Sequence, residues 1–149
     1  MTAVHEIVIA IQWLNGVLAG DSTLAGLAPG GVWRALAPPL DGNGNPLATP
    51  YVIFGTQSVG NDTLTFNAYR LLSRPLYMVK ATGPANNMQA IASAANEIDA
   101  LLKRTAGTVV GGFVGACYRE SPLHVDSLVN GELWSDIGGL YRFEVQQTS

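Results

Sequence analysis

The stretch Pro50-Tyr51-Val52-Ile53-Phe54-Gly55 decides the fold, because its place between the other elements orders the whole chain. Its aromatic and β-branched residues are typical of a buried strand. A proline- and glycine-rich segment at residues 38–50 precedes it, and an amphipathic pattern precedes that segment. Two further extended segments, a second helical pattern and a glycine-rich alternating region follow it. The chain is therefore predicted to run helix, short strand, open loop, strand, strand, helix and sheet.

The composition predicts one domain with an unusually sparse set of charges. A chain of 149 residues has the commonest domain size and is long enough to bury a real core, so we expect residues 1–149 to form a single domain. Apolar residues make up 48% of the chain and charged residues only 13%, about half of the usual share of roughly 25%. Two interpretations stay open: a globule rich in glycine and alanine, or a chain whose surface is partly covered by other subunits.

The charge balance and the single cysteine argue against several classes of protein. With a net charge of −3 and 8 scattered basic residues, the chain lacks the basic patch that specific nucleic-acid binding requires. Cys117 is the only cysteine, so no disulfide framework is expected. No Lys or Arg precedes the first apolar run, and the uncharged residues 7–20 are too few to cross a bilayer. We expect a soluble protein that is assembled in the cytoplasm and has no membrane partner.

An amphipathic helix is predicted at the start of the chain, over about residues 2–19. Its apolar positions recur every three to four residues, as on the core-facing stripe of a helix; they are Val4, Ile7, Val8, Ile11, Leu14 and Leu18. Ile9, Trp13 and Val17 widen that stripe until most of the circumference is apolar. Because such a helix is usually covered on more than one side, these three residues are the candidate subunit interface.

The middle of the chain is predicted to consist of strands around one long loop. A short strand is expected at residues 31–37, whereas residues 38–50 hold four prolines and the run Asp41-Gly42-Asn43-Gly44-Asn45, which exclude regular structure. The next strand covers residues 51–60. After a break at residues 60–62, extended segments are expected at residues 63–69 and 71–82, with an irregularity at Pro75.

A second helix carries the clearest local signals. Pro84 suits the first helical position, and Gly107 provides the exit. The predicted inward face consists of Met88, Ile91, Ala92, Ala95, Ile98, Leu101 and Leu102. The residues expected to face water are Glu97, Asp99, Lys103 and Arg104.

The C-terminal part is predicted to complete a sheet. Residues 108–119 form a strand whose glycines let another backbone or a bulky side chain approach closely. Val129-Asn130-Gly131-Glu132 is the pattern of a two-residue hairpin, and residues 140–147 alternate between apolar and polar side chains, as in a half-buried strand. The predicted fold class is α+β, with a mostly antiparallel β-sheet and two α-helices packed on one face.

Two motifs imitate functional loops without meeting their requirements. Asp41-x-Asn43-x-Asn45 resembles the start of an EF-hand calcium loop, but Pro46 and Val52 stand where that loop needs Gly and Glu. Residues 55–60 imitate a nucleophile elbow with one residue too many between glycine and serine. Neither motif therefore predicts a binding or catalytic site.

The remaining titratable residues do not form a recognisable constellation. Ser58, His124 and Asp126 can be grouped on paper as a catalytic triad, although nothing in the sequence brings them together. The two histidines and the one cysteine show no metal-ligand spacing. We predict no catalytic residue, no cofactor and no metal ion.

Several segments resemble the tail-completion family of long-tailed bacteriophages, which includes tail terminators and tail-to-head joining proteins. The resembling segments span nearly the whole chain: residues 19–24, Gly31-Val32-Trp33, Ala37-Pro38, Pro50-Tyr51-Val52-Ile53-Phe54, residues 91–102, Val129-Asn130-Gly131 and residues 138–145. Pro-Tyr-Val-Ile-Phe is the most specific of them. The chain differs from the family pattern in the length of residues 38–48 and in residues 72–75, so loop contacts are not carried over residue by residue.

The resemblance implies a structural virion protein and not an enzyme. It implies a hexameric ring in the tail or neck of the virion that caps the finished tail tube, ends its polymerisation and joins the tail to the head. The implied partners are further copies of the chain, the tail tube protein and the head–tail connector or stopper protein, while DNA passes through the lumen without specific binding. We expect the long, polar and weakly charged segments at residues 38–50 and 60–68 to face partners; their candidate contact residues are Asp41, Asn43, Asn45, Asn61, Asp62 and Thr63.

Two alternatives stay open. One is another ring-forming virion component, either a head-completion protein or a tail-tube subunit, the latter polymerising without a fixed end. The other is a small α+β hydrolase or ligand-binding domain, for which we expect a monomer or dimer with a concave pocket.

Overall fold

The computed structural model describes residues 4–64, 70–103 and 106–148. In chain order its elements are α1 (Glu6–Ala19), α2 (Ser22–Leu27), β1 (Val32–Arg34), β2 (Tyr51–Ser58), β3 (Asp62–Leu64), β4 (Arg70–Ser73), β5 (Leu76–Pro84), a 3₁₀ turn (Ala85–Asn87), α3 (Met88–Leu102), β6 (Gly107–Val109), β7 (Gly112–Val129) and β8 (Glu132–Gln147). The main elements follow the predicted order, but the segment expected at residues 71–82 is divided into β4 and β5, and the strand expected at residues 108–119 is divided into β6 and β7.

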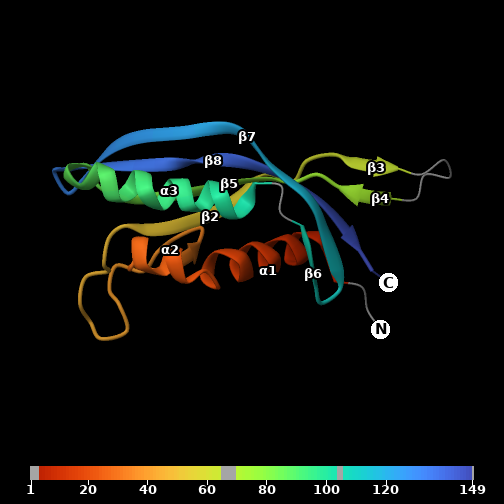
Figure 1. Cartoon of the computed structure of the whole chain (residues 1–149), viewed down its shortest axis with the longest axis horizontal. Helices are drawn as coiled ribbons and strands as arrows, with labels where there is room; N and C mark the ends of the chain where they lie inside the picture. Colours follow the sequence, from red (N-terminus) through yellow and green to blue (C-terminus); the bar gives the residue numbers. More distant parts are fainter. Residues whose placement is uncertain (1–3, 65–69, 104–105, 149) are drawn as a thin grey trace.

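The strands form one eight-stranded sheet that is antiparallel except for the β1–β2 pair. β8 is its central strand: β5 and then β4 pair along one side of it, and β7 pairs along the other. The molecule is elongated, with the β7–β8 turn at one end and β3 and β4 projecting at the other (Figure 1). We call these ends the hairpin end and the arm end. The predicted α+β class is confirmed.

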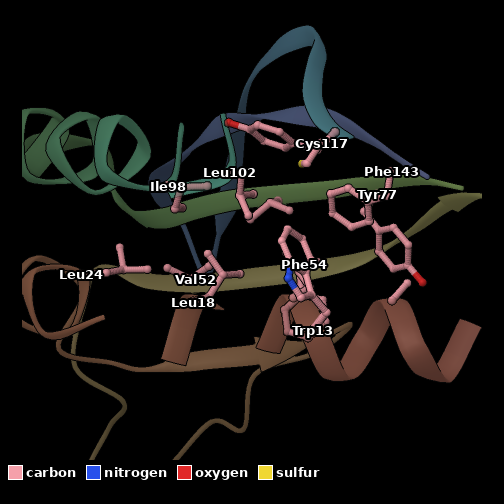
Figure 2. Packing of buried hydrophobic residues seen from close by; sticks show 14 of the residues in the cluster. Trp13, Leu18, Leu24, Val52, Phe54, Tyr77, Ile98, Leu102, Cys117 and Phe143 are labelled. Carbon is pink, nitrogen blue, oxygen red and sulfur yellow. The ribbon is translucent and has the colours of Figure 1, made fainter. Parts of the chain in front are cut away.

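The core lies between one face of this sheet and the helices. The stretch Pro50-Tyr51-Val52-Ile53-Phe54-Gly55 contributes Val52 and Phe54, which are 0% and 1% exposed. Phe143 of β8 stacks on Tyr77 of β5 and meets Trp13 of α1 edge-on, with ring centroids 5.2 Å apart in both pairs. Figure 2 shows Phe54 and Trp13 facing each other between the sheet and α1. Side chains from both long helices join this one cluster, so both helices cover the same face of the sheet.

Helix α1 begins at Glu6, later than the predicted start, and His5 caps it because its Nδ1 accepts a hydrogen bond from the amide of Ile7 at 3.2 Å. The helix is apolar on several sides because β6 and β7 also pack against it. A Cβ at Gly112 would lie 2.3 Å from Ile9, and one at Gly107 would lie 2.9 Å from the Trp13 indole. The predicted close approach at the β7 glycines is therefore confirmed at Gly112.

Helix α3 differs from its prediction at both ends. Pro84 closes β5, and a 3₁₀ turn precedes the helix, so Pro84 is not its first residue. Met88 is 37% exposed and not inward, whereas Ala94 is completely buried. Asp99 was expected to face water, but its carboxylate accepts a hydrogen bond from the hydroxyl of Tyr141 at 3.0 Å.

The C-terminal hairpin is longer than its pattern predicts. Asn130 and Gly131 have φ values of 52° and 80°, which confirms the two-residue turn between β7 and β8. β7 continues to Val129, well beyond the predicted end at residue 119, because it stays paired with β8 throughout its length. The turn between β6 and β7 was not predicted from the sequence. Gly111 lies in this turn and has a φ of 89°.

The central loop and the break between β4 and β5 follow the prediction. Residues 38–50 contain no helix or strand, and one isolated bridge joins Leu40 to Pro46. The chain leaves the sheet at Arg74 and Pro75 between β4 and β5. Residues 65–69 of the predicted segment 63–69 lie outside the described residues.

Candidate interaction surfaces

The structure separates the residues that could be grouped as a triad. The hydroxyl of Ser58 accepts a hydrogen bond from the amide of Gly60 at 3.1 Å, near the arm end. His124 and Asp126 lie on β7, with 3.2 Å between Nε2 and Oδ1, and Ser135 donates to the same carboxylate oxygen at 2.5 Å. The carboxylate thus lies between the serine and the histidine, and no serine–histidine bond forms that would activate a nucleophile.

The thiol and the acidic groups are placed for structure. Burial raises the pKa of the Cys117 thiol, with a further contribution from Asp99, so little of it is the reactive thiolate at neutral pH. Within the described part of the chain, no three His, Cys, Asp or Glu side chains lie close enough to hold a metal ion. Among the same residues, no helix is long and apolar enough to span a membrane.

An open cleft of about 350 Å³ at the arm end contains titratable side chains, among them His5 and Asp62. His5 caps α1, and Asp62 accepts a hydrogen bond from the hydroxyl of Ser73 at 2.8 Å. These side chains are engaged in holding the cleft walls, so they do not form an acid–base pair aimed at a substrate.

The candidate loop at residues 38–50 has a well-formed tip. The Oδ1 atom of Asp41 accepts hydrogen bonds from the amides of Asn43 and Asn45 at 2.8 and 3.0 Å. Asp41 therefore holds the turn, whereas the exposed side chains of Asn43 and Asn45 are the ones presented to a partner. Figure 1 shows this loop leaving the body beyond the start of β2.

The second candidate segment lies at the other end of the molecule. Asn61 and Asp62 are exposed, and Thr63 is half-buried opposite Leu72 of β4. The two segments flank opposite ends of β2, so the structure does not bring them together into one docking surface. If both contact partners, those partners are at different ends.

The candidate subunit interface on α1 requires a correction. Ile9 and Trp13 are 0% and 4% exposed because they pack inside the chain's own core, so they offer no surface to a second copy. Val17 is half-buried against the same core. The extra apolar width of α1 is used within the chain, by β6 and β7.

Leu36, which is 83% exposed, follows β1, and many of the other exposed large apolar side chains lie at the two ends of the molecule. At the hairpin end they are Met88, Leu128, Val129 and Leu133. At the arm end they are Val59, Leu64, Val110 and Phe113. Leu128 is 75% exposed and Val110 is 82% exposed. The sequence does not reveal either group, because exposure depends on which faces the folded sheet leaves uncovered; at Val110 and Leu128 the β6–β7 turn and the second half of β7 were also not predicted.

The sheet face opposite the core is lined by half-buried apolar side chains around one ion pair. The Nζ of Lys80 lies 2.7 Å from Oδ2 of Asp136, and their side chains are only 19% and 15% exposed. Thr82 donates a hydrogen bond to the other carboxylate oxygen. Burial, together with the nearby charge of Asp136, raises the pKa of Tyr51 on the same face. This ion pair is satisfied within one copy.

The comparisons with known proteins identify the fold and no family. No family model matches the chain, and no curated protein matches it. Among solved structures, the fold is similar to that of a chain in the structure described as "Virion of native gene transfer agent (GTA) particle", with a TM-score of 0.70 and 16% identity. The similarity covers 97% of this chain and 99% of that one. At this identity the likeness shows a shared fold, from one end of each chain to the other.

Proposed function

We propose that this chain is a structural protein of a phage-like virion, and more specifically the subunit of a ring that closes the head-proximal end of the tail. The observation that carries the proposal is the fold similarity to a virion chain over 97% of this chain and 99% of the other. The sequence resemblance to tail-completion proteins supports the same assignment independently.

The distribution of exposed side chains supports a protein that contacts different partners at its two ends. Apolar side chains that would be buried in most soluble monomers lie exposed at both the hairpin end and the arm end. In a ring, one of these ends contacts the last turn of the tail tube and the other contacts the head connector. The loop tip at Asn43 and Asn45 belongs to one end and the segment at Asn61 to the other.

A ring also accounts for how such a protein stops tube growth. A head-to-tail contact between identical subunits closes into a ring when its rotation completes a full circle, and the assembly then stops growing. A second ring does not add when the far end of the first ring is not complementary to the near end of the second. The low content of basic side chains lets DNA pass without adhering.

The proposal is tested with the purified chain and with polymerising tail tubes. Native mass spectrometry and electron microscopy are expected to show one closed ring of about six copies, and ring addition is expected to arrest tube growth. Filaments of indefinite length would favour a tail-tube subunit. A monomer that turns over a small molecule would favour the enzyme alternative and contradict the proposal.

The partner-facing role of the loop has its own test. Replacing Asn43 and Asn45 by alanine keeps the Asp41 turn, which uses backbone amides, and is expected to reduce the joining of tails to heads. The matched control is the same double change at Gln12 and Asn15, two exposed amide side chains on α1, away from both ends. Normal joining by the loop variant would exclude this tip as a docking surface.

A further inference from the structure

The second half of β7 has a free edge. β7 pairs with β6 only at residues Gly112–Val114, and beyond that it pairs with β8 alone among the described strands. A bulge and Pro122 protect the middle of this edge. From Leu123 to Val129 there is no proline, glycine or bulge. An uninterrupted edge of this kind is a template for a strand of another chain.

The hairpin fixes which backbone groups of this edge point outward. In an antiparallel pair, residues that exchange hydrogen bonds alternate with residues whose amides and carbonyls point away. The two-residue turn makes Val129–Glu132 a bonded pair, so the outward residues are Leu128, Asp126 and His124. Ser135 lies opposite Asp126 and is completely buried on the helix-covered face of the sheet. The side chains of Leu128, Asp126 and His124 therefore lie on that face as well.

The opposite edge of the same sheet is β1. Among the strands that the structure describes, it pairs only with β2, in parallel. The carbonyl of Gly31 accepts from the amide of Val52, and the amide of Ala35 donates to the carbonyl of Phe54. The intervening backbone groups of Val32 and Arg34 therefore point outward. Arg34 is exposed and forms no ion pair with another described residue.

We propose that β1 of one copy pairs with β7 of the next copy, so that Val32 lies opposite Leu128 and Arg34 lies opposite Asp126. This inference rests on the proposed ring, whose subunit contact it specifies. β1 and β7 run in opposite directions within the sheet. Neighbours in a ring whose axis runs along the strands have the same orientation, so the two edges meet as antiparallel strands.

Charge selects this register. It places the Arg34 cation opposite the Asp126 carboxylate, an arrangement that stabilises cross-strand pairs. Asp126 is available for this contact because its side chain is 48% exposed, although Ser135 and His124 already touch it. Val32 and Leu128 each have an outward amide and carbonyl, so this pair exchanges two hydrogen bonds. The carbonyl of Arg34 already accepts from the amide of Leu36 at 2.7 Å, so at the second pair the amide of Arg34 donates to the carbonyl of Asp126.

Shape favours the same register. An apolar cleft of about 170 Å³ lies beside β1 on the helix-covered face, lined by Leu24, Ala28 and Val32 among others. Leu128 of the next copy, opposite Val32 and on the same face, lies at the mouth of this cleft. The contact would bury a leucine that is 75% exposed in the single chain, in surroundings of matching polarity.

Closure of the sheet is compatible with this register as well. Within one copy, the row of paired residues that starts at Val32 passes through Val52, Ala81 and Ile137 and ends at His124. The next copy contributes Leu128 and not His124 beside Val32, a shift of four residues (128 − 124) along β7. Sheets that close on themselves need a stagger of this kind, because their strands tilt against the axis.

The interface is tested by native mass spectrometry of the full-length chain and of matched variants. Leu128→Asp and Arg34→Asp are each expected to raise the concentration needed for half-assembly by about tenfold or more, since each leaves an unpaired charge at the contact. Val110→Asp, at an equally exposed position at the arm end, is expected to leave assembly unchanged. Arg34→Asp combined with Asp126→Arg is expected to recover rings that Arg34→Asp alone has lost. Unchanged thermal unfolding of the Leu128 and Arg34 variants confirms that they fold.

Cross-linking checks the register directly. A chain carrying both Arg34→Cys and Asp126→Cys, treated with a short bismaleimide, is expected to give a ladder of linked copies, and each single variant is not. Cys117 is buried and does not compete. If the chain forms rings but the variants still assemble and no ladder forms, this interface is overturned and the ring stands. If the unmodified chain stays monomeric at every concentration, the ring and this interface are both overturned.

Discussion

The two halves of β7 have the same partner on one side and very different surroundings on the other. Near Val114 the strand is buried, paired with β6 as well as β8, and packed under α1. Near Val125 it pairs with β8 alone and is exposed. The comparison teaches that the first half stabilises the fold, while the second half is uncovered and is the part that the proposed ring contact uses.

The sharpest way to break this comparison is to place the same charge in both halves. Val114→Asp is expected to lower the free energy of unfolding by about 5 kcal/mol or more, because it buries an unpaired carboxylate. Leu128→Asp, in the outer half at a position that is 75% exposed and lies opposite Leu133, is expected to change it by less than about 0.5 kcal/mol, as at other surface positions. Urea denaturation measures both values. Equal losses would show that the outer half is as important for folding as the inner half.

The aromatic cluster beneath the inner half should be the next most sensitive feature. Phe143 packs on Tyr77 and Trp13 and is 0% exposed. Phe143→Ala is expected to cost about 3–5 kcal/mol, from lost burial and the cavity left behind. Calorimetric unfolding measures the loss, and Phe113→Ala is the control, because Phe113 is 39% exposed on β7. A similar loss at both positions would contradict the assigned core.

The contact between α3 and the sheet should contribute less. Asp99 accepts a hydrogen bond from Tyr141 and lies 3.8 Å from the guanidinium of Arg119. Asp99→Ala removes these partners and is expected to cost about 1–2 kcal/mol. Because burial and the bond to Asp99 raise the pKa of Tyr141, the variant is also expected to lower that pKa. Ultraviolet titration of the tyrosines measures this pKa. An unchanged pKa of Tyr141 in the variant would contradict the contact.

The smallest expected effect lies in the exposed half of β7. The hydrogen bond from Ser135 lowers the pKa of Asp126, and the nearby His124 lowers it to a lesser extent. A carboxylate with a lowered folded-state pKa adds stability above its unfolded pKa, and that contribution is lost as the pH falls through the folded value. Ser135→Ala is expected to raise the pKa of Asp126 in an NMR titration, and His124→Gln to raise it less. The reverse ranking would contradict the assigned geometry.

Local patterns were sufficient for much of the fold. The Asn130-Gly131 hairpin, the loop at residues 38–50 and the buried strand at Val52 depend on short-range chemistry, and the structure has them where they were predicted. The wrong assignments depend on distant contacts. An apolar helix face looks the same whether a second copy or its own sheet covers it, so Ile9 and Trp13 were placed at an interface when β7 and β8 bury them.

The candidate surfaces were harder to predict for the same reason. The loop tip at Asn43 could be identified from its composition, but its separation from Asn61 follows from the direction of β2, which only the folded sheet shows. Arg34 and Asp126 carry no motif and lie far apart in the sequence. They are related only because they belong to the two opposite edges of one sheet.

The mass of the purified chain in solution, measured together with electron micrographs of the same sample, tests the central claim most directly. The account predicts a single closed ring of about six copies that forms at moderate concentration without any partner. A chain that remains a single copy at every concentration, or that grows into filaments of unlimited length, would contradict it.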